Sequence, residues 1–167
     1  IWDYRKQQLF LARDRFGQKP LFYAFTKEKF VFASEMKAIL PFLPEVVPSK
    51  HFNWCVQNIF EYENTDKCLI KGIQRFPSGH YGYLDLPKQQ IDFHKYWHTF
   101  EHLPEVPKTY EDQVSAFRAL LLDACQLRMR ADVPIGTALS GGLDSSAIIS
   151  AIAHISNTSQ RAERVSN

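Results

Sequence analysis

The residues best suited to chemistry lie in one short polar loop between two apolar runs: Leu139-Ser140-Gly141-Gly142-Leu143-Asp144-Ser145-Ser146. Glycines let a backbone approach an anion closely, and three serine hydroxyls can donate hydrogen bonds to it. If a helix begins after the loop, its first N–H groups have no partners within the helix and point at the same anion. The pattern predicts a phosphate-binding loop.

Asp144 lies among these donors, where a carboxylate repels phosphate unless it binds a metal ion or caps the helix. A magnesium-bound nucleotide resolves this conflict. The loop has neither the Gly-Lys-Ser/Thr ending of the common phosphate-binding loop nor the three spaced glycines of the dinucleotide motif. The alternative without a function is an ordinary Gly-Gly turn capped by serine and aspartate.

The segments beside the loop must position it. Residues 133–139 form an apolar run that predicts a buried strand, and residues 147–155 are apolar enough for a buried helix. Upstream, Thr109 is a candidate N-cap with Asp112 three residues later. A long helix is expected after this cap, because apolar residues recur at helical spacing at Val114, Phe117, Leu120, Leu121, Ala124 and Leu127.

This strand, loop and helix resemble the signature region of the ATP pyrophosphatase superfamily, whose members cleave ATP between the α- and β-phosphates and transfer AMP to a carboxylate or carbonyl oxygen. The resemblance implies the start of an α/β, Rossmann-like domain with a parallel sheet. It also implies that Asp144 binds Mg²⁺. The residues that it assigns to ATP are Leu139, through its backbone, Ser140, Gly141, Gly142, Asp144, Ser145 and Ser146.

The N-terminal part is rich in strand patterns. Residues 9–13 and 21–26 flank a polar turn with Gly17 and Pro20, which predicts a hairpin in which Arg13 and Asp14 could pair locally. A strand at 29–34, a short helix at 34–40 and a second hairpin from 81–86 and 91–97 follow. Ser49 could cap a further helix.

The segment 9–23 closely resembles the C-terminal part of the class II glutamine amidotransferase domain, and residues 33–39 follow as they do there. Residues 71–81, Tyr96-Trp97 and 128–136 continue the resemblance in order up to the phosphate loop. The chain is therefore identified as a member of the glutamine-hydrolysing asparagine synthetase family. The family implies an α+β, Ntn-type glutaminase part with antiparallel sheets at 1–97 and a synthetase part at 109–167. The polar, proline-bearing stretch at 98–108, just before the candidate cap Thr109, is the expected linker.

The same resemblance implies ATP-dependent amidation of aspartate to asparagine through β-aspartyl-AMP, with ammonia from glutamine and release of AMP and pyrophosphate. The implied ligands are aspartate, glutamine, ATP and Mg²⁺, and pairing of two copies as a homodimer stays open. Three alternatives remain: a β-lactam synthetase-like enzyme, another amidotransferase, and a non-catalytic nucleotide-binding remnant.

A class II glutaminase uses an N-terminal cysteine as nucleophile, whereas this sequence starts with Ile1-Trp2-Asp3. We therefore expect an internal fragment with no catalytic residue for glutamine hydrolysis and no activity by itself. Cys55, Cys68 and Cys125 form no CxxC pair and are expected to be buried structural thiols in a reducing compartment.

The composition fits an ordinary globular protein: 20 basic residues against 18 acidic ones give no indication of nucleic-acid binding. No run reaches the roughly 18 apolar residues that span a membrane, so we expect no membrane partner and a cytoplasmic location. His94 and His98 share the spacing of a helical zinc pair but lie on a strand pattern, so packed or solvated histidines are favoured. Glu35 and Lys37 are expected to be exposed charges on a helix.

Overall fold

The computed structural model describes residues 1–165, and it describes the side chains of all of these except Asn64 and residues 159–165. The chain divides into two compact units, Ile1–Leu103 and a second unit that begins at Pro104. Residues 166–167, which belong to the expected segment 109–167, lie outside the described residues.

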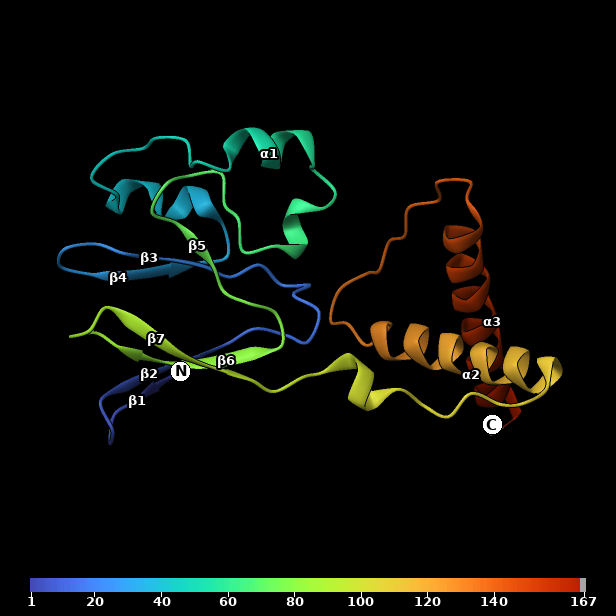
Figure 1. Ribbon diagram of the computed structural model, residues 1–167. Coiled ribbons are helices and arrows are strands. Elements are labelled where there is room, and N and C mark those ends of the chain that lie inside the picture. Colours follow the sequence, from blue (N-terminus) through green and yellow to red (C-terminus); the bar gives the residue numbers. More distant parts are fainter. Residues whose placement is uncertain (166–167) are drawn as a thin grey trace. The chain divides into compact units, whose positions relative to one another are not determined.

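The first unit contains two antiparallel sheets (Figure 1). The four-stranded sheet has the order β1-β2-β6-β7, formed by Trp2–Asp3, Gln8–Ala12, His80–Asp85 and Gln90–Lys95. The three-stranded sheet has the order β4-β3-β5, formed by Phe30–Ala33, Phe22–Phe25 and Gln74–Arg75. Every pairing in both sheets is antiparallel, as expected for this part of the chain.

Two adjacent strand pairs follow the sequence closely. The hairpin expected near 81–97 is confirmed, because β6 and β7 pair from His80 with Lys95 to Asp85 with Gln90. Strands β3 and β4 also pair, across a tight turn in which the Thr26 N–H donates to the Lys29 carbonyl at 2.8 Å.

The hairpin expected from 9–13 and 21–26 is wrong, because β2 and β3 belong to different sheets. The segment that connects β2 to β3 wraps around the Arg13 side chain instead of forming a hairpin turn. The Arg13 guanidinium donates to the carbonyls of Gly17 and Lys19 in this segment and to that of Phe76. Arg13 and Asp14 do not pair as an ion pair within the described part of the chain. The Asp14 carboxylate instead accepts the backbone N–H groups of Gln18 and Lys19, which lower its pKa although burial acts in the opposite direction.

The core explains why the three-stranded sheet lies in the middle of this unit. Successive residues of a strand face opposite sides, so Tyr23 packs with Leu11, Phe76 and Ile91 between the two sheets. On the other face, Phe22 and Ala24 pack with Ile39, Cys68 and Ile73. Figure 1 shows the segment that carries α1 above β3 and β4, on the side away from β6 and β7.

Short helices connect the strands. The expected helix at 34–40 forms two 3₁₀ turns instead, η1 at Met36–Ala38 and η2 at Leu40–Phe42. Helix α1 covers Phe52–Gln57, η3 covers Tyr62–Asn64 and η4 covers Thr99–His102. Ser49 does not cap α1, since its hydroxyl accepts the His51 N–H at 3.1 Å and donates to the Cys68 carbonyl.

The described part of the second unit contains two helices that contact each other, α2 at Tyr110–Arg128 and α3 at Leu143–Val165. The expected cap of α2 is confirmed, because Thr109 Oγ1 accepts the Asp112 N–H at 3.2 Å. Helix α3 includes the expected 147–155 and extends beyond it at both ends. None of the described helices is long and apolar enough to cross a membrane.

The strand expected at 133–139 is absent: these residues have no regular structure, and Val133, Ile135 and Leu139 are 69%, 50% and 63% exposed. A parallel strand needs neighbouring strands to pair with, and the described part of the second unit contains none. Much of the apolar face of α2 is similarly uncovered, with Phe117 68% exposed. The structure thus has the antiparallel sheets of the first part but not the parallel sheet expected for the second.

Candidate functional site

The loop at 139–146 has the backbone shape that its glycines allow. Gly141 adopts a φ of +82°, which favours glycine, and a Cβ at this position would meet only open space. The first hydrogen bond of α3 runs from the Ser146 N–H to the Gly142 carbonyl at 3.2 Å. The N–H groups of Leu143, Asp144 and Ser145 therefore precede the helical ladder and are available to an anion.

The three serines converge on this loop. The hydroxyl oxygens of Ser140 and Ser145 lie 3.0 Å apart, and the Gly142 N–H donates to Ser140 Oγ at 3.4 Å. Ser145 and Ser146 donate their hydroxyls to the Gly142 carbonyl at 3.1 and 2.8 Å. Ser140 and Ser146 are exposed and Ser145 is partly buried, so a rotation about χ1 can turn their hydroxyls toward a phosphate.

Asp144 lies in the first turn of α3, where a negative charge is favoured by the helix dipole. Among the described residues, no three His, Cys, Asp or Glu side chains converge to hold a metal ion. The donor set fits Mg²⁺ bound together with a nucleotide, because this ion often takes one or two carboxylates and completes its shell with phosphate oxygens and water. Leu139 and Leu143 are exposed on both sides of the glycines.

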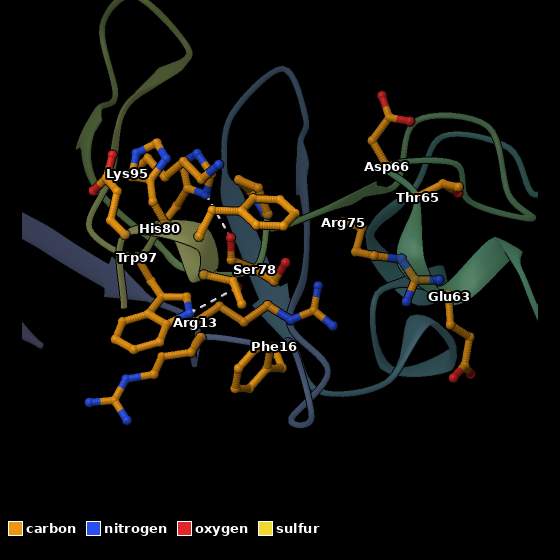
Figure 2. A pocket seen from close by; sticks show the side chains of 16 residues that line it. Arg13, Phe16, Glu63, Thr65, Asp66, Arg75, Ser78, His80, Lys95 and Trp97 are labelled. Carbon is orange, nitrogen blue, oxygen red and sulfur yellow. Dashed lines mark hydrogen bonds between the residues drawn. The ribbon is translucent and has the colours of Figure 1, made fainter. Parts of the chain in front are cut away.

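A pocket of about 540 Å³ in the first unit was not expected from the sequence. In Figure 2, Arg13 and Trp97 lie on one side of this pocket, and Arg75, Thr65 and Asp66 lie on the other. Arg15 stacks over the Trp97 ring, with Cζ 4.5 Å from the ring centroid. The pocket gathers residues from β5, β6, β7, the segment after β2 and other connections, so no local spacing could have indicated it.

Arg13 and Arg75 are the two buried charged residues of the first unit's described part, each 7% exposed. Arg13 donates to the carbonyls of Lys19 at 2.9 Å, Phe76 at 2.8 Å and Gly17 at 2.7 Å. Burial lowers the pKa of Arg13, and the neighbouring Arg75 charge lowers it further. Arg75 lies beside the rings of Phe22 and Tyr62, with Cζ 5.0 and 4.9 Å from their centroids.

The other candidates from the sequence have structural roles. His94 binds Asp92 at 3.0 Å and stacks on Tyr81, while His98 lines the pocket. Glu35 and Lys37 form an exposed ion pair at 2.7 Å. The three cysteines are buried free thiols, as expected: Cys55, Cys68 and Cys125. Burial raises the pKa of Cys68 to about 11, although Arg75 acts against this rise.

Comparison with known proteins matches the two parts of the chain to two families. The glutamine amidotransferase domain family matches residues 1–97, and the asparagine synthase family matches residues 116–166. The chain is 33% identical over 165 residues to "Asparagine synthetase [glutamine-hydrolyzing] 2" of Bacillus subtilis, covering 89% of this chain and 21% of that protein. It is 30% identical over 165 residues to "Putative asparagine synthetase [glutamine-hydrolyzing] 2" of Methanocaldococcus jannaschii, covering 96% of this chain and 31% of that protein.

A relative with a different name is equally similar. The chain is 32% identical over 160 residues to "Amidase chry2" of Gibberella zeae, covering 93% of this chain and 23% of the relative. The chain thus spans only 21% to 31% of the length of these curated relatives. The resemblance noted in the sequence is confirmed, and the chain belongs to the glutamine amidotransferase domain family, followed here by a segment of the asparagine synthase family.

Proposed function

We propose that this chain is part of a glutamine-hydrolysing asparagine synthetase, a cytoplasmic enzyme that uses ATP to convert aspartate to asparagine. One observation carries this proposal: a glutamine amidotransferase domain and an asparagine synthase segment follow one another in a single chain. The first part would belong to the half that releases ammonia from glutamine. The second would belong to the half that activates aspartate.

The reaction needs ATP because a carboxylate oxygen is a poor leaving group. In the proposed reaction, a β-carboxylate oxygen of aspartate attacks the α-phosphorus of ATP. The bond between the α-phosphorus and the oxygen that bridges to the β-phosphorus breaks, and pyrophosphate leaves with the bonding electrons. Ammonia then attacks the acyl carbon of β-aspartyl-AMP, and AMP leaves with the oxygen that came from the aspartate carboxylate. Loss of a proton from the nitrogen gives asparagine.

The loop at 139–146 would act where negative charge builds up on the departing pyrophosphate. Preorganised N–H and hydroxyl donors stabilise such charge most effectively when they need little rearrangement. The backbone N–H groups before the first helical bond of α3 supply such donors, and the hydroxyls of Ser140, Ser145 and Ser146 would add to them after rotating away from their present partners. Asp144 would hold Mg²⁺, which offsets the negative charge of the phosphates when it is bound. Leu139, Gly141 and Gly142 would place their backbone against the nucleotide.

We also propose that residues 1–97 form part of the glutaminase domain, residues 98–108 a linker, and residues 109–167 the start of the synthetase domain. In a complete synthetase domain, residues 133–139 would pair as a strand of a Rossmann-like parallel sheet. The apolar side chains exposed there, such as Val133 and Ile135, support this assignment, because a paired and covered strand would remove them from water.

The test is an assay of aspartate-dependent pyrophosphate release from ATP, with this sequence placed in a protein that contains both complete domains. Asp144→Ala should lower the rate by about 100-fold or more, since the carboxylate and its metal stabilise charge in the transition state. The matched control is Asp123→Ala, which removes an exposed aspartate from α2. Wild-type synthesis by the Asp144 variant would remove this residue from the mechanism.

The similarity to proteins named amidases favours a second candidate, a related enzyme that acts on a different carboxylate or amide. The same assay separates the two candidates. Pyrophosphate release that needs aspartate supports asparagine synthesis, whereas release with other carboxylates but not with aspartate supports the second candidate. A protein that binds ATP but releases no pyrophosphate with any carboxylate would instead be a nucleotide-binding remnant.

A further inference from the structure

The pocket in the first unit has a charge pattern suited to a single negative charge. Its lining contains three carboxylates and four basic side chains, which leaves one excess positive charge: Glu63, Asp66 and Glu101 against Arg13, Arg15, Arg75 and Lys95. No ion pair joins Arg75 to any carboxylate within the described part of the chain. The excess charge is therefore not neutralised locally by a direct contact.

Arg75 lines this pocket, and one edge of its guanidinium is unsatisfied behind the pocket wall. Its Nε and Nη2 atoms are shielded from water and have no hydrogen-bond partner among the described residues. Leaving donors of a charged group unpaired and buried is unfavourable, because the group loses its hydrogen bonds to water and gains none in the protein. These two N–H groups lie on the same edge of the planar guanidinium, and this edge matches the two oxygens of a carboxylate.

Arg13 shows that a buried arginine of this unit need not lack hydrogen-bond partners, since it is as buried as Arg75. All three guanidinium nitrogens of Arg13 donate to backbone carbonyls, and they hold the connection between β2 and β3. The charge of Arg75 adds to the lowering of the Arg13 pKa, so the two like charges lie close enough to repel each other. An anion beside Arg75 would relieve both this repulsion and the unpaired edge.

We propose that this pocket binds a small monocarboxylate whose two oxygens accept hydrogen bonds from Nε and Nη2 of Arg75. A carboxylate fits better than a phosphate, because the three acidic side chains of the pocket repel a second negative charge. The site lies in the first unit and uses none of the residues at 139–146. Its failure would therefore leave the proposed function untouched.

Entry to the edge requires a small movement of the pocket wall, because the two nitrogens expose almost no surface. The rings of Phe22 and Tyr62 lie against the guanidinium, and Tyr62 belongs to the short turn η3 rather than to a sheet. Phe22 is buried in the core, whereas Tyr62 is only partly buried. Tyr62 is therefore the side chain expected to shift when the carboxylate enters.

The experiment is an acetate titration of the ¹⁵N-labelled chain, followed through the arginine Nε–H signals and the indole N–H signal of Trp97. Sodium chloride at equal ionic strength is the reference, and inorganic phosphate is the competing probe. Arg75→Lys keeps the charge but loses the two-donor edge, so it identifies the Arg75 signal and should weaken acetate binding by about tenfold or more. Arg118→Lys, an exposed change on α2, is the matched control.

The proposal holds if the Arg75 signal shifts saturably with acetate, more strongly than with phosphate, and if the Trp97 response weakens in Arg75→Lys. If Arg75→Lys does not fold, Glu63→Gln provides the second variant: it removes a negative charge from the pocket and should tighten acetate binding about twofold. The absence of a saturable shift, an equal response in Arg75→Lys, or tighter binding of phosphate would overturn the proposal.

Discussion

Replacing Arg13 by methionine should destabilise the first unit by about 4 kcal/mol. The bond from Nη1 to the Phe76 carbonyl is buried, and hydrogen bonds to charged groups contribute about 1.5–3 kcal/mol each. The bonds to the carbonyls of Lys19 and Gly17 are only partly buried, so we assign them about 1 kcal/mol each. Methionine keeps much of the apolar stem but supplies no donor to any of the three carbonyls.

The assay is native-state hydrogen exchange of the full chain, read at the backbone amides of β2, β3 and β6. A loss of about 4 kcal/mol corresponds to an increase of about 1,000-fold in the exchange rate of amides that open with the unit. The amides of α2, in the second unit, provide an internal reference. Arg13→Lys should cause a smaller increase, since one ammonium group cannot reach all three carbonyls.

Arg15→Met is the matched control, because it makes the same chemical change two residues away on an exposed side chain. Its cation–π contact with Trp97 should account for only about 0.5–1 kcal/mol. An Arg13→Met effect below about 1 kcal/mol, or an effect equal to that of Arg15→Met, would refute the conclusion that Arg13 holds the connection between the two sheets.

Three further outcomes are expected. Gly82→Ala should lower the melting temperature, because its Cβ would lie 2.4 Å from Cγ2 of Ile91 and such overpacking typically costs about 1–3 kcal/mol; an unchanged melting temperature would show that β7 adjusts freely. Burial raises the pKa of the Cys68 thiol from 9.0 to about 11 and that of the Tyr23 phenol from 10.0 to about 12, so the unfolded chain loses these protons first. The contribution of these two groups to stability should therefore be constant below pH 9, and stability measured by urea unfolding should fall between pH 9 and 12; a flat profile over this range would contradict this. Thr109→Ala should destabilise α2 by about 1 kcal/mol in far-UV circular dichroism, with Thr158→Ala as the control for loss of a threonine elsewhere; equal losses would argue against a capping role.

Local patterns could be predicted from the sequence where neighbouring residues supply the structure. The hairpin of β6 and β7 and the capped start of α2 depend on turn and cap residues within a few positions, so both were found. The residues of the phosphate loop were also recognisable, because the loop is contiguous and its glycines and serines require no distant partner. Their role in binding ATP remains a prediction.

The two sheets could not be assigned in the same way. Residues 9–13 and 21–26 have the alternation of a hairpin, but a strand pairs with whichever neighbour covers its core face and satisfies its backbone groups. Here β2 pairs with β6 and β3 pairs with β5, and both partners lie more than 50 residues later in the sequence. No local pattern distinguishes these pairings from a hairpin.

The sequence by itself determined the capped helix and the family, and it predicted a phosphate-binding role for the loop at 139–146, since each of these depends on residue types at short spacings. Only the tertiary structure revealed the pocket with the unpaired edge of Arg75, and only it showed that Arg13 binds three carbonyls instead of Asp14. The physical reason is that burial and hydrogen-bond satisfaction depend on the sum of contacts from distant segments. An arginine looks the same in the sequence whether these contacts satisfy all of its N–H donors or leave some of them unpaired.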